Sequence, residues 1–306
     1  MMSSQIALTL KELGLACINT SNIYAQRTRD NPSLNVYRDC ISGVIYIADE
    51  QDHLDKYQSG DYPENNTRVL KRTVNQTALN QDEIDLKRRL YDFEYYFKDK
   101  VICDVGCGLG GFLLAAKHQA KAVYGVELQE DCVYDLTQKG VACATTITDI
   151  DTDMMFDTVF MFHSFEHMNE PMNMLREIKG RLKPGGHLII EVPHANDLLL
   201  GEAPNFAFKA FTLWSQHLIL HTHESIKKML RGAGFESVNI QGYQRYGLEN
   251  HLGWYLNGQA GGIKQVALRW VLCRLEKPYQ KYLQKNKQTD TLIAIIEQTD
   301  NINRGI

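Results

Sequence analysis

The chain has 306 residues, of which 44% are hydrophobic and 23% are charged, proportions typical of a protein with a buried core. Its formal net charge of −4, from 33 basic and 37 acidic side chains, gives no electrostatic reason to expect nucleic acid or an anionic membrane as a partner. No apolar run approaches the roughly 18 residues that span a bilayer, and the N-terminus has no basic leader, so neither a membrane span nor a signal peptide is expected.

The seven cysteines of the chain are scattered, and no two of them form a CxxC pair. Several of them, such as Cys103, Cys107 and Cys143, fall inside apolar or glycine-rich segments, as buried thiols do. This distribution is typical of reduced cysteines, and it predicts a cytoplasmic protein.

The first hundred residues show no regular alternation of strands and helices. Within them, VYRDCISGVIYI (36–47) predicts a β-hairpin with Ser42 and Gly43 at its turn. The basic run Lys87-Arg88-Arg89 lies in a segment with helical spacing. Because runs of like charge are usually exposed to solvent, we expect this run to form a solvated helix face.

From residue 100 onward, short apolar runs alternate with segments of helical spacing. The runs have the length of buried strands, and they are VICDVG (101–106), AVYGVEL (122–128), VACATTIT (141–148), FDTVFMFH (156–163) and HLIIEVP (187–193). This alternation predicts βαβ units with right-handed crossovers, and therefore an α/β fold with a parallel sheet. Further along, we expect a helix capped by Thr222, an amphipathic segment (263–285) and a last strand (291–298).

A glycine-rich loop, DVGCGLGG (104–111), follows the first of these strands. Gly106, Gly108 and Gly111 satisfy the dinucleotide pattern G-x-G-x-x-G, and Glu127 at the end of the second strand could bind a ribose, so an NAD(P)-dependent oxidoreductase is one hypothesis. Asp104 argues against it, because dinucleotide enzymes carry an apolar residue at this strand position. A buried carboxylate is costly unless a donor satisfies it.

The Asp-x-Gly-x-Gly pattern resembles motif I of the class I S-adenosylmethionine-dependent methyltransferases. The resemblance continues in the family's order over roughly residues 100–240 and the last strand. It implies a Rossmann-like, seven-stranded, mostly parallel sheet with helices on both faces, in which TLIAIIEQ inserts antiparallel beside strand five. Outside the sheet, it implies N-terminal and C-terminal additions that cover the substrate. The expected domain boundaries are 1–90 for an N-terminal lid region, 91–244 with 288–300 for the methyltransferase domain, and 245–287 for an insertion.

The same resemblance implies that the cofactor is S-adenosyl-L-methionine and the product S-adenosyl-L-homocysteine. The glycine loop would lie under the methionine part, Asp104 would help to hold its amino group, and Glu127 would hold the ribose. The residues expected to bind the cofactor are Asp104, Gly106, Cys107, Gly108, Gly110, Glu127, Leu128, Asp149, Ile150 and His163. Of these, Asp149 and Ile150 fit the family's adenine-contacting position.

The stretch HSFEH (163–167) spells the His-x-x-Glu-His pattern of one class of zinc peptidases. That site needs both histidines on one stable helical face, and Pro171 disfavours a long helix here, so we reject this interpretation. Some quinone-pathway O-methyltransferases carry a Glu-x-x-Glu-His version that is thought to use a divalent cation. His163 replaces the first of those glutamates, and although His163, Glu166 and His167 could still share a metal, we expect none.

Transfer of a methyl group to a hydroxyl usually needs a base, and histidine suits that role. We expect the catalytic residue to be His167 or His194, of which the second directly follows strand five. His217 and His221 have ligand-compatible spacing for zinc. Since no cysteine partner or second tight pair accompanies them, we interpret their segment, QHLILHTH, as pocket wall or core.

The acceptor must be recognised by the parts of the chain outside the sheet. The segment VYRDCISGVIYI followed by YQSGDYPE is similar to the leader of methyltransferases tied to surface-polysaccharide or sugar-nucleotide pathways. Sugar C-methyltransferases among them carry a cysteine-rich zinc module, of which only Cys40 remains here. We therefore predict methylation of a hydroxyl on a small molecule, such as a saccharide or glycan precursor in polysaccharide biosynthesis, without a nucleic acid or membrane partner. A cofactor-binding protein without turnover is the other alternative, and the oligomeric state stays open.

Overall fold

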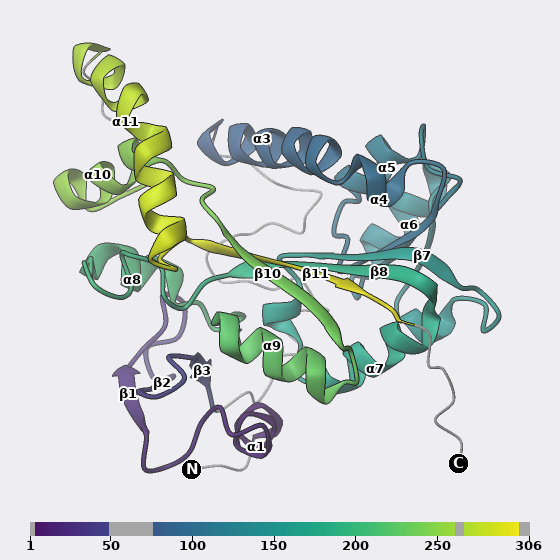
Figure 1. Cartoon of the computed structure of the whole chain (residues 1–306), viewed down its shortest axis with the longest axis horizontal. Helices are drawn as coiled ribbons and strands as arrows, with labels where there is room; N and C mark the ends of the chain where they lie inside the picture. Colours follow the sequence, from purple (N-terminus) through teal and green to yellow (C-terminus); the bar gives the residue numbers. More distant parts are fainter. Residues whose placement is uncertain (1–3, 49–75, 261–265, 300–306) are drawn as a thin grey trace. The chain divides into compact units, whose positions relative to one another are not determined.

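The structure is a computed structural model that describes residues 4–48, 76–260 and 266–299 (Figure 1). Its contacts divide the chain into two compact units. The first unit comprises Met1–Glu50, Val192–Ile226 and Ile240–Ile293, and the second unit comprises Gln51–Glu191, Lys227–Asn239 and Ala294–Ile306. The domain boundaries expected from the sequence remain predictions, and the segment YQSGDYPE lies outside the described residues.

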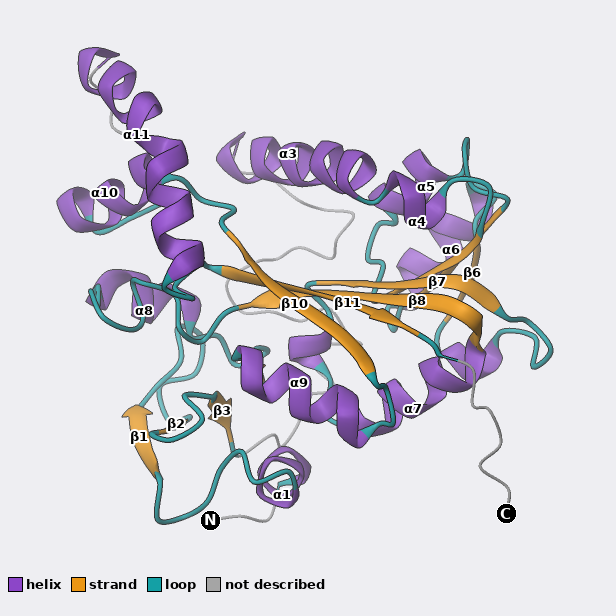
Figure 2. Ribbon diagram, in the orientation of Figure 1, coloured by secondary structure: helices purple, strands orange, loops and turns teal. Residues whose placement is uncertain are grey.

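Seven strands form the larger sheet, in the order β10-β11-β8-β7-β4-β5-β6 (Figure 2). Their bounds are β4 (Val101–Val105), β5 (Ala122–Val126), β6 (Ala142–Ala144), β7 (Phe156–Phe162), β8 (Leu182–Pro193), β10 (Ser237–Tyr243) and β11 (Thr291–Glu297). The strands β6, β5, β4, β7 and β8 pair in parallel. Backbone hydrogen bonds join Gly185 to Gln298 and His194 to Asp290, so β11 runs antiparallel to β8. The predicted fold class and the placement of the last strand are thus confirmed.

Helices connect these strands and lie against the sheet. Figure 1 shows α4 and α5 on one side of it and α7 on the other. The helices of this part are α3 (Gln76–Asp92), α4 (Glu94–Phe97), α5 (Gly111–Ala116), α6 (Glu130–Gln138), α7 (Pro171–Arg181) and α9 (His223–Gly232), with the 3₁₀ turns η2 (Ile147–Asp149) and η3 (Phe165–His167). The predicted cap of α9 is confirmed, because the Ser225 N–H donates to Thr222 Oγ1 over 3.2 Å.

An aromatic cluster anchors the helix that follows the glycine loop. The ring of Phe112, in α5, packs edge-on against Phe160 and Phe162 of β7, with ring centroids 4.9 and 5.0 Å apart. Phe93, after α3, stacks on Phe162 at 5.7 Å. Since these side chains come from three different elements, they fix the start of α5, and with it the loop, against the central strand.

The first unit contains a smaller antiparallel sheet in the order β1-β2-β3-β9. Its strands and the helices of this unit are α1 (Gln5–Glu12), β1 (Ser21–Ala25), β2 (Val36–Asp39), β3 (Ile45–Ile47), α8 (Phe206–Thr212), β9 (Ile219–Leu220), α10 (Leu248–Asn257) and α11 (Val266–Lys285). The predicted hairpin is β2–β3, and β9 belongs to the segment QHLILHTH, in which His221 is fully buried with Nδ1 bonded to Ser225 Oγ. No helix in the described ranges has an apolar stretch long enough to cross a bilayer.

Candidate active site

The glycine loop after β4 has a backbone that only glycine adopts readily. Gly106, Gly108 and Gly110 have φ angles of +77°, +54° and +65°. A Cβ on Gly106 would lie 2.4 Å from the Cβ of Ser164, and one on Gly110 would lie 2.3 Å from Leu136. One on Gly108 would meet no atom of the described residues within 4 Å. The first and third glycines therefore allow close packing, and Gly108 leaves open space beside the loop.

A pocket of about 320 Å³ lies in the second unit, at the carboxyl ends of β4, β5 and β7. Open α/β folds bind their ligands at this edge of the sheet. The residues that line it are Val105, Gly106, Val126, Glu127, Leu128, Thr145, Thr146, Ile147, Thr148, Ser164, His167, Met168, Asn169, Glu170, Asn173, Met174 and Glu177. Four of the residues predicted from the sequence, Gly106, Glu127, Leu128 and His167, are thus brought together.

Glu127 is positioned by backbone donors on both of its carboxylate oxygens. Oε2 accepts from the Gly108 N–H over 2.9 Å, and Oε1 accepts from the Gln129 N–H over 3.1 Å. The side chain is 2% exposed, and burial raises its pKa against the opposing effect of these two N–H groups. The carboxylate therefore stands fixed between the glycine loop and the pocket wall.

Asp104 is a buried carboxylate with an unsatisfied oxygen. The residue is 4% exposed, and Oδ1 has no hydrogen-bond partner among the residues that the structure describes. Burial raises the pKa of Asp104 to about 7, although the charge of Arg89 opposes this rise. A buried acceptor without a donor is unfavourable, so this position suits a ligand that brings a positively charged donor.

The pocket wall after β6 differs from the one expected. Asp149 and Ile150 do not line the pocket, whereas the residues just before them, 145–148, do. The Asp149 side chain is exposed and accepts from Thr145 Oγ1 over 3.0 Å, and hydrogen bonds from Thr146 and Thr145 lower its pKa. The adenine contact of Asp149 and Ile150 remains a prediction, and the three threonines are pocket residues that the sequence had not singled out.

Cys107, in the middle of the glycine loop, is paired with another thiol. A hydrogen bond to Cys143 raises the pKa of Cys107 and lowers that of Cys143. Both sulfurs lie over Gly125 of the intervening strand, where an added Cβ would be 2.9 and 3.0 Å from them. A glycine at this point of β5 therefore makes room for the contact between the loop and β6.

His163, directly after β7, has a left-handed backbone with a φ of +52°, which is uncommon for a residue with a side chain. Its N–H donates to the carbonyl of Glu191 over 2.8 Å. Nδ1 lies 3.4 Å from Glu166 Oε1, and Nε2 lies 3.2 Å from Glu191 Oε1. The imidazole is therefore held between two buried carboxylates at the edge of the sheet.

Of the basic run in α3, Lys87 is solvated as predicted, whereas Arg88 and Arg89 are not. The Arg88 Nη2 lies 2.8 and 2.7 Å from the two oxygens of Glu191, and the Arg89 Nη2 lies 2.8 Å from Oε1. The side chains of Arg88, Arg89 and Glu191 are only 9%, 16% and 0% exposed. Burial alone would raise the pKa of Glu191, but the hydrogen bond from His163 and the two guanidinium charges hold it well below its usual range.

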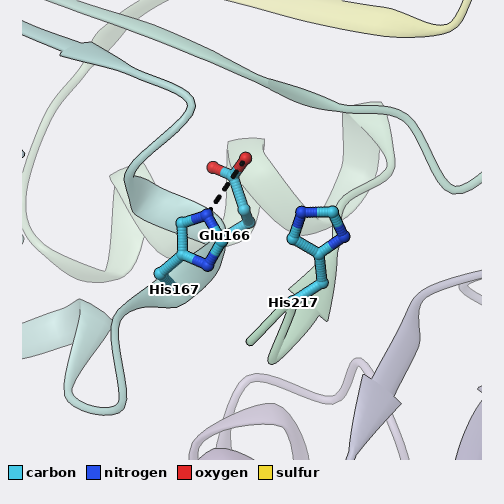
Figure 3. A group of neighbouring side chains, drawn as sticks. All are labelled: Glu166, His167 and His217. Carbon is cyan, nitrogen blue, oxygen red and sulfur yellow. Dashed lines mark ion pairs between the residues drawn. The ribbon is translucent and has the colours of Figure 1, made fainter. Parts of the chain in front are cut away.

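The HSFEH stretch forms no zinc-peptidase helix. After His163, the chain continues in the three-residue 3₁₀ turn η3, so the two histidines do not share a helical face. Figure 3 shows the side chains of Glu166 and His167 turned toward each other, with Oε1 and Nε2 3.9 Å apart. Glu166 is 1% exposed, whereas His167 lines the pocket.

His194 lies in the first unit, directly after β8, and is 1% exposed. Nδ1 is bonded to the Thr289 carbonyl over 2.8 Å, so this nitrogen carries the proton. Nε2 is buried and has no hydrogen-bond partner in the described part of the chain. Burial, aided by the nearby His223, lowers the pKa of His194 to about 3. The ring is therefore neutral near pH 7 but a weak proton acceptor, and its catalytic role remains a prediction.

Comparison with known proteins shows which family this sequence matches. A family model described as a methyltransferase domain matches residues 71–240, more than half of the chain. Phosphoethanolamine N-methyltransferase 1 of Zea mays is 26% identical over 149 residues, which are 45% of this chain and 28% of that protein. A tRNA U34 carboxymethyltransferase of Cellvibrio japonicus (strain Ueda107) is 28% identical over 160 residues, 47% of each chain.

A third relative is the ubiquinone biosynthesis O-methyltransferase of Ralstonia nicotianae (strain ATCC BAA-1114 / GMI1000). It is 31% identical over 107 residues, which are 32% of this chain and 44% of that protein. The chain thus spans less than half the length of each of these three relatives.

Proposed function

Because this chain belongs to the class I S-adenosylmethionine-dependent methyltransferases, we propose that it methylates a hydroxyl group of a small-molecule acceptor, with His167 as the group that takes the hydroxyl proton. The chain is therefore a methyltransferase whose cofactor is S-adenosyl-L-methionine, and not the NAD(P)-dependent oxidoreductase that the glycine pattern had left open. The observation that carries the proposal is the place of His167 on the wall of the cofactor pocket.

Residues of the pocket wall and of the glycine loop next to it fit this cofactor. The unsatisfied Oδ1 of buried Asp104 would accept from the amino group of the methionine part, and the open side of Gly108 leaves room for the chain beside the loop. Glu127 would take the ribose hydroxyls, since its carboxylate already stands fixed at the pocket wall. A volume of about 320 Å³ is within the range of small-molecule sites.

When bound, the cofactor supplies a methyl group on a sulfonium, which is already activated toward a nucleophile. The protein has to align the acceptor and remove its proton. The His167 imidazole would take that proton, and the Glu166 carboxylate, whose Oε1 lies 3.9 Å from Nε2, would stabilise the imidazolium that results. Glu166 is nearly fully buried, so water screens this interaction only weakly.

The acceptor class is the finer part of the proposal. A saccharide or glycan-precursor hydroxyl is supported by the similarity of residues 36–47 to the leader of saccharide-pathway methyltransferases. The relatives are named for other acceptors: phosphoethanolamine, a tRNA and ubiquinone biosynthesis. The net charge of −4 was the reason to exclude nucleic acid, and a relative named for tRNA keeps it among the acceptors to be tested.

Methyl transfer from radiolabelled S-adenosylmethionine to a panel of saccharides, catechols, phosphoethanolamine and tRNA tests the proposal. With the acceptor that reacts, His167→Asn should lower kcat by about 10²- to 10⁴-fold, the usual contribution of a general base. The affinity for S-adenosylhomocysteine should change only a few-fold. The pH–rate profile of the variant should also lose its acidic limb.

The matched control is His118→Asn, since His118 is exposed at the surface of the second unit. If the only acceptor that reacts is an amine, and His167→Asn transfers methyl groups to it at the rate of the unmodified enzyme, the proposed base and hydroxyl acceptor are both wrong. The assignment of the cofactor would stand in that case.

A further inference from the structure

The surface of helix α11, in the first unit, has three lengthwise faces that differ in character. With 3.6 residues per turn, side chains spaced by three and four positions share one face. The first face is buried: Leu272 and Leu283 are 6% and 0% exposed. Tyr279 lies on the same face, with its hydroxyl 2.6 Å from His251 Nδ1 of α10. These contacts attach α11 to its own unit and leave the other two faces outward.

The second face is an apolar stripe that solvent reaches. It is formed by residues at positions i, i+4, i+7 and i+11, namely Val271, Leu275, Pro278 and Tyr282. Val271, Leu275 and Tyr282 are 48%, 49% and 53% exposed. Single exposed apolar residues are ordinary, but a continuous stripe over three turns of one helix indicates an interaction surface.

The third face is basic and borders the apolar stripe. Positions i, i+3, i+7 and i+11 from residue 274 carry Arg274, Lys277, Lys281 and Lys285, all exposed. The sole acidic residue of 271–285, Glu276, is turned away, since its carboxylate accepts from the Leu248 N–H and the Gln280 side chain over 2.9 Å each. The segment therefore has four basic and one acidic side chains, a net charge of +3, in a chain of net charge −4.

We propose that this surface of α11, the apolar stripe with its basic border, docks the protein onto an anionic lipid surface. An amphipathic helix with lysines beside an apolar face lies in the plane of a bilayer, where its apolar side chains enter the acyl boundary and its lysine stems reach the headgroups. Clusters of basic residues are attracted to anionic lipids in the same way. This role goes beyond methyl transfer and does not depend on the acceptor.

A second copy of the chain fits the surface less well. In a pair of α11 helices packed antiparallel along their apolar stripes, the four basic side chains of each copy would face those of the other. Like charges at such a seam destabilise the pairing. Parallel packing would instead place the basic face of each copy against the face by which the other is attached to its own unit. A surface of opposite charge is needed, and anionic headgroups would supply it along residues 274–285.

Sedimentation of the full chain with vesicles tests the proposal. Vesicles of phosphatidylcholine alone are compared with vesicles that also contain phosphatidylglycerol, at low and high salt. We expect binding to the anionic vesicles only, weakened by salt. The triple variant Lys277→Gln, Lys281→Gln, Lys285→Gln should bind about a hundredfold more weakly, from about fivefold for each lysine near an anionic surface.

The matched control, with the same change in net charge, is Lys87→Gln, Lys98→Gln, Lys121→Gln, since these lysines are exposed elsewhere in the chain. A second variant, Val271→Glu with Leu275→Glu, should abolish vesicle binding while the far-UV circular dichroism and the affinity for S-adenosylhomocysteine stay unchanged. If neither vesicle binds, or if both lysine triples weaken binding equally, the proposal is overturned. It is also overturned if the glutamate variant only dissolves a dimer seen by ultracentrifugation.

Discussion

Protonation of Asp104 should control the affinity of the enzyme for its cofactor. The pKa of this buried carboxyl is about 7 in the free protein, so roughly 9% is ionised at pH 6 and about 76% at pH 7.5. Only the ionised carboxylate offers a positively charged amino group both a negative charge and a free acceptor oxygen. We therefore expect S-adenosylhomocysteine to bind about eightfold more tightly at pH 7.5 than at pH 6.

The sign of this pH dependence follows from the linkage between proton binding and ligand binding. A ligand that binds the ionised form must displace the proton, and this costs binding free energy at every pH below the pKa of the free protein. Calorimetric titrations of S-adenosylhomocysteine at several pH values measure the effect, and they should also show release of a proton near pH 6. In Asp104→Asn the affinity should be lower and independent of pH over this range. An unchanged pH dependence in that variant would refute the reasoning.

Two predictions concern the stability of the second unit. Glu191→Gln removes the carboxylate that two buried guanidinium groups share, and leaves Arg88 the more distant Asp85 and Asp92, 3.8 Å away each. It should lower the free energy of unfolding by about 3–5 kcal/mol in urea titrations, while Glu83→Gln, at an exposed ion pair, should leave it unchanged. The folded state depresses the pKa of Glu191 below its ordinary value of 4.5. The carboxylate therefore contributes to the free energy of unfolding above pH 4.5, and this contribution is lost as the pH falls below that value. Glu191→Gln should not show this loss. Gly106→Ala should destabilise the protein more than Gly140→Ala, since both glycines have similar positive φ angles but only the first would clash. Equal losses of stability would mean that backbone strain alone fixes the loop.

The central sheet and the glycine loop could be predicted because both leave a local mark on the sequence. A parallel strand covered on both faces is a continuous apolar run, as in residues 156–162. The left-handed turns at Gly106, Gly108 and Gly110 require glycine, so their spacing could be recognised. Glu127 could also be placed from the sequence, because it directly follows an apolar run of the length expected for a strand.

The charged cluster around Glu191 could not be predicted in the same way. A run of three basic residues is usually solvated, and the partner of Arg89 lies 102 positions further along the chain. Only the tertiary fold brings the two together. A signal was nevertheless present, because Glu191 stands in the apolar run HLIIEVP, and a carboxylate in a buried strand needs buried donors.

The net charge of a whole chain says little about what a single surface of it can contact. At physiological ionic strength a charge acts over about 8 Å, so a surface in contact with α11 responds to the +3 of residues 271–285 and not to the −4 of the whole. Buried groups are screened much less. Salt should therefore separate the two electrostatic effects described above: about 0.5 M salt should release α11 from anionic vesicles, and yet leave the pH dependence that Asp104 gives to cofactor binding in place. High salt would then distinguish the exposed charges of α11, which it screens, from the buried charge of Asp104, which it does not.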